Sequence, residues 1–129
     1  MARILIVDDD EMYRTTLRRL ITRRGHTVEE AANGREALER VAAADFDVVV
    51  TDIVMPEKEG IETIVEMRGA GVTAGIIAIS GGGRVGPDSY LSLASSLGAD
   101  RVLKKPVANA DLMAAIAAVT GAQDDDRDE

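Results

Sequence analysis

The strongest constraint on this chain is an alternation along its length between short apolar runs and longer amphipathic stretches. The apolar runs measure four to six residues, as buried strands do, and the amphipathic stretches of ten to fifteen residues are long enough for helices. Five such pairs follow one another. This alternation favours a parallel sheet with helices on both faces, joined by right-handed crossovers. The sequence therefore predicts an α/β fold with a doubly wound, five-stranded parallel sheet.

The individual elements follow from the same pattern. The predicted strands are Arg3–Asp8, Thr27–Ala31, Asp47–Asp52, Gly75–Ser80 and Arg101–Lys104. The predicted helices are Glu11–Arg24, a helix capped by Asn33-Gly34-Arg35-Glu36 that reaches Ala43, Lys58–Arg68, Pro87–Leu97 and Asn109–Thr120. A chain of 129 residues with one such series is expected to form one domain.

Composition excludes several classes of protein. The net charge of −8 argues against direct binding of nucleic acid, because phosphate binding needs clustered lysine and arginine. No apolar run approaches the roughly 18–20 residues of a membrane span, so we expect no membrane contact and a cytoplasmic protein. The last eight residues, AQDDDRDE, hold five acids and one base. We expect a single domain over residues 1–121 and a disordered acidic tail over residues 122–129.

Polar side chains gather where the predicted strands end. In a doubly wound sheet all strands point the same way, so their carboxyl ends lie along one edge, where ligands bind. That edge would carry Asp8 and Asp9 from the first strand, Asp52 from the third, Ser80 from the fourth and the Lys104-Lys105-Pro106 segment after the fifth. The sequence therefore predicts that three carboxylates, a hydroxyl and an ammonium group converge.

Such a set of groups suits one kind of chemistry. Three neighbouring carboxylates repel one another unless a cation lies among them, and an all-oxygen site favours Mg²⁺, with Mn²⁺ as an alternative ion. Asp52 ends a buried strand alone and suits a nucleophile that forms an aspartyl-phosphate. A lysine from the fifth strand could pair with Asp52 and then with the phosphoryl group, to which the Ser80 hydroxyl could also donate.

Four segments carry a family resemblance. The sequences ILIVDD (4–9), VVVTDIVMP (48–56), IIAIS (76–80) and LGADRVLKKP (97–106) resemble those of response-regulator receiver domains of two-component signalling. The similarity extends from Arg3 to Thr120, and the motifs occur in the order of that family. It implies a flavodoxin-like (βα)5 fold with strand order 2-1-3-4-5. Because the sequence ends soon after the fifth predicted helix, we expect a stand-alone, single-domain receiver if the chain is complete, and a missing output domain if it is truncated.

The resemblance also implies roles for individual residues. Asp52 would take a phosphoryl group from a histidine kinase or a histidine phosphotransfer protein, catalysing only its own phosphorylation and dephosphorylation. The other implied roles are Mg²⁺ binding by Asp8, Asp9, Asp52 and the backbone carbonyl of Val54, a switch hydroxyl at Ser80 and phosphate pairing by Lys105. The Lys105-Pro106 bond is expected to be cis. The output would be contact with an unidentified downstream protein.

An enzyme remains the alternative. Asp8 and Asp10 resemble the D-x-D motif of haloacid-dehalogenase-type phosphatases, which also form an aspartyl-phosphate with Mg²⁺ and use a downstream Ser/Thr and Lys. That family needs a further acidic pair after the lysine, where this chain has Pro106-Val107-Ala108-Asn109. Turnover of a generic phosphomonoester distinguishes the two.

Two residues near the acidic pair have structural interpretations. Asp10 follows Asp8 and Asp9 directly and is typical of a helix cap. Tyr13, one of only three aromatic residues in the chain, is interpreted as a partly buried packing residue.

Overall fold

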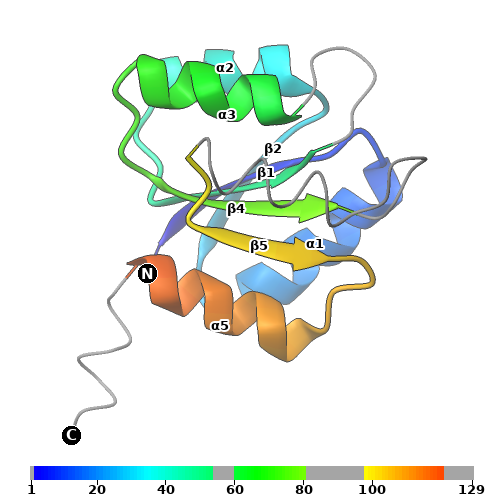
Figure 1. Cartoon of the computed structure of the whole chain (residues 1–129). Helices are drawn as coiled ribbons and strands as arrows, with labels where there is room; N and C mark the ends of the chain where they lie inside the picture. The colour runs from blue at the N-terminus through cyan, green and yellow to red at the C-terminus, as the bar shows by residue number, and fades with distance from the viewer. Residues whose placement is uncertain (1, 54–59, 81–97, 121–129) are drawn as a thin grey trace, which may run out of the picture.

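The computed structural model describes residues 2–53, 60–80 and 98–120, which form a parallel sheet with helices on both sides (Figure 1). The strands are β1 (Arg3–Val7), β2 (Thr27–Ala31), β3 (Val48–Asp52), β4 (Gly75–Ser80) and β5 (Arg101–Lys104). The helices are α1 (Glu11–Arg23), α2 (Gly34–Ala43), α3 (Gly60–Gly69) and α5 (Asn109–Thr120). The predicted helix Pro87–Leu97 and the predicted tail lie outside the described residues.

The sheet has the strand order β2-β1-β3-β4-β5, and every neighbouring pair is parallel. This confirms the predicted α/β fold and its strand order. The chain moves outward from β1 to β2 and then returns to place β3 on the other side of β1. Val7 lies opposite Thr51 in the register, so the residues that follow β1 lie beside the end of β3. This topological switch point is where such sheets bind ligands.

Two hydrophobic layers enclose the sheet. Leu5 and Val7 of β1 belong to the layer under α2 and α3, whereas Ile4 and Ile6 belong to the layer under α1 and α5. Figure 1 shows the two pairs of helices on opposite faces. The central strands are apolar on both faces because neither face meets water. No helix within the described ranges is long and apolar enough to cross a membrane.

The start of α1 is fixed by a side-chain cap. Asp10 Oδ1 accepts hydrogen bonds from the N–H groups of Met12 at 3.0 Å and Tyr13 at 3.2 Å, as the sequence predicts for an N-cap. β1 ends at Val7, one residue earlier than predicted, yet the Asp8 N–H still donates to the Ala31 carbonyl of β2 at 3.1 Å. Asp8 and Asp9 are therefore held in a short turn between a strand and a capped helix.

Candidate functional site

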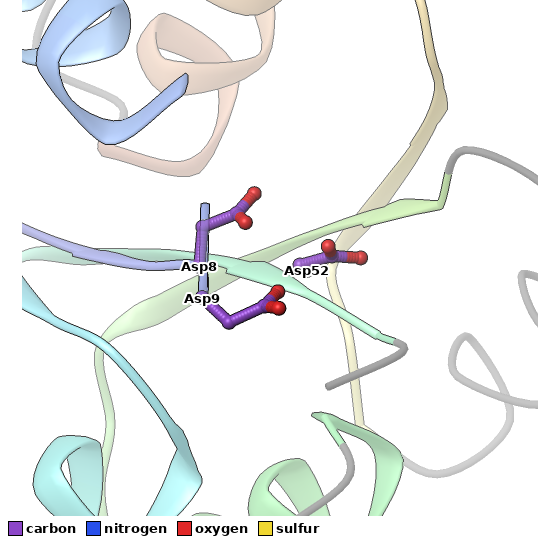
Figure 2. A group of neighbouring side chains, drawn as sticks. All are labelled: Asp8, Asp9 and Asp52. Carbon is purple, nitrogen blue, oxygen red and sulfur yellow. The ribbon is translucent and has the colours of Figure 1, made fainter. Parts of the chain in front are cut away.

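Three aspartates meet at the carboxyl end of the sheet. Figure 2 shows Asp8 and Asp9 side by side after β1, with Asp52 beside them at the end of β3. One carboxylate oxygen from each lies within 4.8 Å of the other two. Asp8 and Asp52 are only 2% and 8% exposed, whereas Asp9 is exposed. The carboxylates of Asp8 and Asp52 are therefore buried, and that of Asp9 is open to solvent.

The turn that carries Asp8 is held by hydrogen bonds on both sides. Asp8 Oδ1 accepts from the Asp10 N–H at 2.9 Å, and the Asp8 carbonyl accepts from Arg14 Nη1 at 2.7 Å. Arg14 Nε in turn donates to Glu30 of β2 at 2.9 Å, and Glu30 also pairs with Arg18. The side chain of Arg14 is only 15% exposed, so this bridge ties α1 and β2 to the backbone of the acidic turn.

Lys105 brings a positive charge to the acids. Its Nζ lies 3.4 Å from Asp8 Oδ2 and 3.4 Å from Asp52 Oδ2. Its backbone N–H donates to the Ser80 carbonyl at 2.9 Å, and the Lys105-Pro106 bond is cis, as expected. Both side-chain distances exceed the roughly 2.7–2.9 Å of a close charge-assisted bond. The ammonium group is therefore shared between two carboxylates and is not seated closely on either.

The pKa directions express the same balance of charges. Burial raises the pKa of Asp8, and the Asp52 charge raises it further, against lowering contributions from the Asp10 N–H and Lys105. Burial alone would lower the pKa of Lys105, but the two carboxylates more than offset it, so its pKa is raised. Lys105 therefore remains a cation at neutral pH, while a charged Asp8 is held at an energetic cost.

Ser80 ends β4, the strand next to β3. It is fully buried, and its Oγ has no hydrogen-bond partner among the residues that the structure describes. A buried hydroxyl without a partner is unfavourable by about 1–3 kcal/mol. The end of β4 thus carries a donor suited to an incoming acceptor oxygen.

The structure brings Asp8, Asp9, Asp52 and Lys105 together as the sequence predicts. Val54, the remaining predicted ligand, lies outside the described residues. Sequence reasoning missed two contributors: Arg14, for which it gave no role, and the contact between the Tyr13 ring and Lys105 Nζ, which is 4.4 Å from the ring centroid. The one feature of the sequence that could have indicated them is position: Tyr13 and Arg14 lie in the first turn of the helix that follows the acidic pair, so their side chains start close to the site.

The donor set also fits a metal ion. All three side chains offer oxygen, the ligand that hard divalent cations prefer, and exposed Asp9 leaves room for the waters that Mg²⁺ usually keeps. A cation here would relieve the repulsion among the carboxylates. The acidic triad could therefore hold an ion such as Mg²⁺.

Comparisons with known proteins agree with this geometry. The family model for the response regulator receiver domain matches residues 4–117. Response regulator MprA of Mycolicibacterium vanbaalenii is 38% identical over 119 residues, which cover 91% of this chain and 49% of that protein. MprA of Mycobacterium tuberculosis is 37% identical and is covered to 50%. The chain thus spans about half the length of these curated relatives.

Solved structures are similar over nearly the whole length of this chain. A receiver domain protein from Clostridium thermocellum has a TM-score of 0.86 at 28% identity, with 96% of this chain and 98% of that one covered. A CheY-like receiver domain protein from Methanospirillum hungatei has a TM-score of 0.86 at 27% identity, with 98% of both covered. The chain belongs to the family of response-regulator receiver domains of two-component signalling.

Proposed function

We propose that this chain accepts a phosphoryl group on Asp52 from a histidine kinase or a histidine phosphotransfer protein, in a two-component or phosphorelay pathway. The observation that carries the proposal is the surroundings of the Asp52 carboxylate. It is nearly buried, it lies within a metal-competent group of three acids, and it has the Lys105 ammonium 3.4 Å from its Oδ2. A carboxylate so placed can attack phosphorus while cations neutralise the phosphoryl oxygens.

In the proposed reaction an Asp52 oxygen forms a bond to phosphorus as the bond from phosphorus to the donor's nitrogen breaks. Asp8, Asp9 and Asp52, with the carbonyl of Val54, would hold Mg²⁺, for which Mn²⁺ can substitute. The ion would supply charge neutralisation and alignment of the phosphoryl oxygens. Lys105 would exchange its contact with the carboxylate for one with a phosphoryl oxygen.

The Ser80 hydroxyl would detect phosphorylation by donating a hydrogen bond to the phosphoryl group. Its buried hydroxyl lacks an acceptor among the described residues, and a phosphoryl oxygen at Asp52 would supply one. The signal would then leave by contact with a downstream protein. Direct binding to nucleic acid is not proposed, because the net charge is −8.

The proposal extends to the organisation of the chain. We place the receiver domain at residues 1–121, followed by a solubilising acidic tail at 122–129, in a cytoplasmic regulator that makes no membrane contact. The family match ending at residue 117 supports this division. The chain would not be a general enzyme: a haloacid-dehalogenase-type phosphatase would turn over a generic phosphomonoester repeatedly with Mg²⁺, and we expect no such turnover.

The direct test is the intact mass of the protein after incubation with acetyl phosphate and Mg²⁺. We expect a gain of one phosphoryl group, and none when the divalent ions are removed with a chelator. Acetyl phosphate is one class of phosphoryl donor, and the same measurement with a set of histidine kinases and histidine phosphotransfer proteins tests the other class. A protein that gains no phosphoryl group from either class would overturn the proposal.

Replacement of Asp9 by alanine should greatly weaken Mg²⁺ binding and slow phosphorylation, because one of three ligands is lost. In metal-free buffer the free energy of unfolding should be unchanged or higher, since one repulsive charge is removed. Calorimetric Mg²⁺ titration and urea unfolding measure the two effects. Asp10→Ala is the matched control: it loses the α1 cap, at about 1 kcal/mol of stability, and keeps its Mg²⁺ affinity. Equal Mg²⁺ affinities for Asp9→Ala and the wild type would exclude the role proposed for Asp9.

A further inference from the structure

The ring of Tyr13 lies against the lysine of the site. Tyr13 is the third residue of α1, and it is half-buried at the margin of the hydrophobic layer between the sheet and α1 and α5. The Lys105 Nζ lies 4.4 Å from the centroid of its ring. This distance is within the roughly 6 Å over which an aromatic face attracts a cation.

The ring is one of three groups around the same ammonium. The other two are the Asp8 and Asp52 carboxylates, each at 3.4 Å. Because neither carboxylate is at close hydrogen-bonding distance, neither alone fixes where the charge lies. Tyr13 contacts the ammonium from α1, whereas Asp8 comes directly after β1 and Asp52 is the last residue of β3. The location of the charge therefore depends on the ring as well as on the acids.

We propose that Tyr13 is a positioning residue for Lys105, holding its ammonium beside Asp52 through the face of the ring. The inference rests on the proposed function of Asp52 and Lys105. An oxygen acceptor in the same place would occupy one of the three N–H donors of the ammonium. The ring attracts the charge without requiring a directed hydrogen bond, so the donors stay available to phosphoryl oxygens. It also tolerates movement of the ammonium from the carboxylate to the phosphoryl group.

Two substitutions at Tyr13 distinguish an effect of the aromatic face on Lys105 from an effect of apolar packing. Tyr13→Leu keeps a comparable apolar side chain and removes the aromatic face, whereas Tyr13→Phe keeps the face and removes only the hydroxyl. With acetyl phosphate and Mg²⁺, Tyr13→Leu should react about three- to tenfold more slowly than the wild type. Tyr13→Phe should retain most of the wild-type rate. A Tyr13→Phe protein as slow as Tyr13→Leu would overturn the role of the ring face.

A double-mutant cycle tests whether the effect passes through Lys105. In a Lys105→Met background there is no ammonium for the ring to hold, so Tyr13→Leu should slow the remaining reaction by less than about twofold. A threefold or larger effect in that background would show that Tyr13 acts by packing, and would overturn the proposal. Leu20→Ala, which trims another partly buried residue of the same helix, is the control and should leave the phosphorylation rate unchanged.

The same cycle can be measured without metal or phosphoryl donor. In metal-free buffer Tyr13→Leu should raise the unfolding equilibrium constant about two- to fivefold more in the wild-type background than in Lys105→Met. Equal effects in both backgrounds would overturn the contact itself. If Tyr13→Leu does not fold, Tyr13→Met replaces it in both cycles.

The two proposals fail in different ways. If the wild type is phosphorylated, Asp52→Asn is not, and Tyr13→Leu reacts at the wild-type rate, only the role of Tyr13 is lost. If the wild type gains no phosphoryl group, the proposed function fails, together with the positioning role that rests on it. The metal-free cycle would then report only on the contact between the ring and Lys105.

Discussion

Replacement of Asp52 by asparagine should abolish the gain of a phosphoryl group from acetyl phosphate, as read from the intact mass. The carboxamide keeps the size of the side chain at the end of β3 but is not a nucleophile for phosphorus. The change also removes one of three clustered negative charges. In metal-free buffer the variant should therefore be as stable as the wild type or more stable, which excludes unfolding as the reason for the loss.

A matched control removes an acid elsewhere. Asp45 is exposed and precedes β3 in the chain, so Asp45→Asn changes the net charge by the same amount without touching the site. It should gain one phosphoryl group at the wild-type rate. If the Asp52→Asn protein gained a phosphoryl group to the same extent as the wild type, the phosphoacceptor would be a residue other than Asp52.

The fold was predictable because its strongest signals are local and periodic. The apolar runs of β1, β3 and β4 are buried on both faces, and such runs separated by amphipathic helices allow few arrangements. The strand order then followed from the family resemblance. The site was predictable for the same reason: once the strands are parallel, Asp8 and Asp52 must end at one edge. Their roles in phosphorylation are still predictions.

The supporting contacts could not be predicted in this way. Arg14 of α1 donates to the Asp8 carbonyl through Nη1 and to Glu30 of β2 through Nε at 2.9 Å, and no local sequence pattern encodes that pairing of helix and strand. Tyr13 was interpreted as a packing residue, which is correct but incomplete. Its contact with Lys105 joins residues 92 positions apart in the sequence, and it depends on the path of the chain after β5.

The backbone at Asp52 is also held in place by Gly60, the first residue of α3. The Gly60 N–H donates to the Ile53 carbonyl at 2.7 Å, which draws the start of the helix against the chain just after β3. A Cβ added at Gly60 would lie 2.6 Å from Ile53 Cα and closer still to the Asp52 carbonyl oxygen. Both neighbours are backbone atoms, which cannot rotate away as a flexible side chain would. Position 60 therefore has room only for glycine, because any side chain there would collide with the backbone of Asp52 and Ile53.

Gly60→Ala should accordingly cost about 1–3 kcal/mol or more in the free energy of unfolding, because α3 or the end of β3 must shift. The phosphorylation rate should fall with it, since displacement of the Asp52 backbone moves its carboxylate away from Asp8 and Lys105. Gly69→Ala, at the other end of α3, is the matched control. A Cβ there would meet no atom within 4 Å, and alanine should stabilise the helix by up to about 1 kcal/mol. Urea unfolding and the rate with acetyl phosphate would be measured for both variants. If Gly60→Ala matched the wild type in stability and rate, close contact at Gly60 would not be what fixes Asp52 in place.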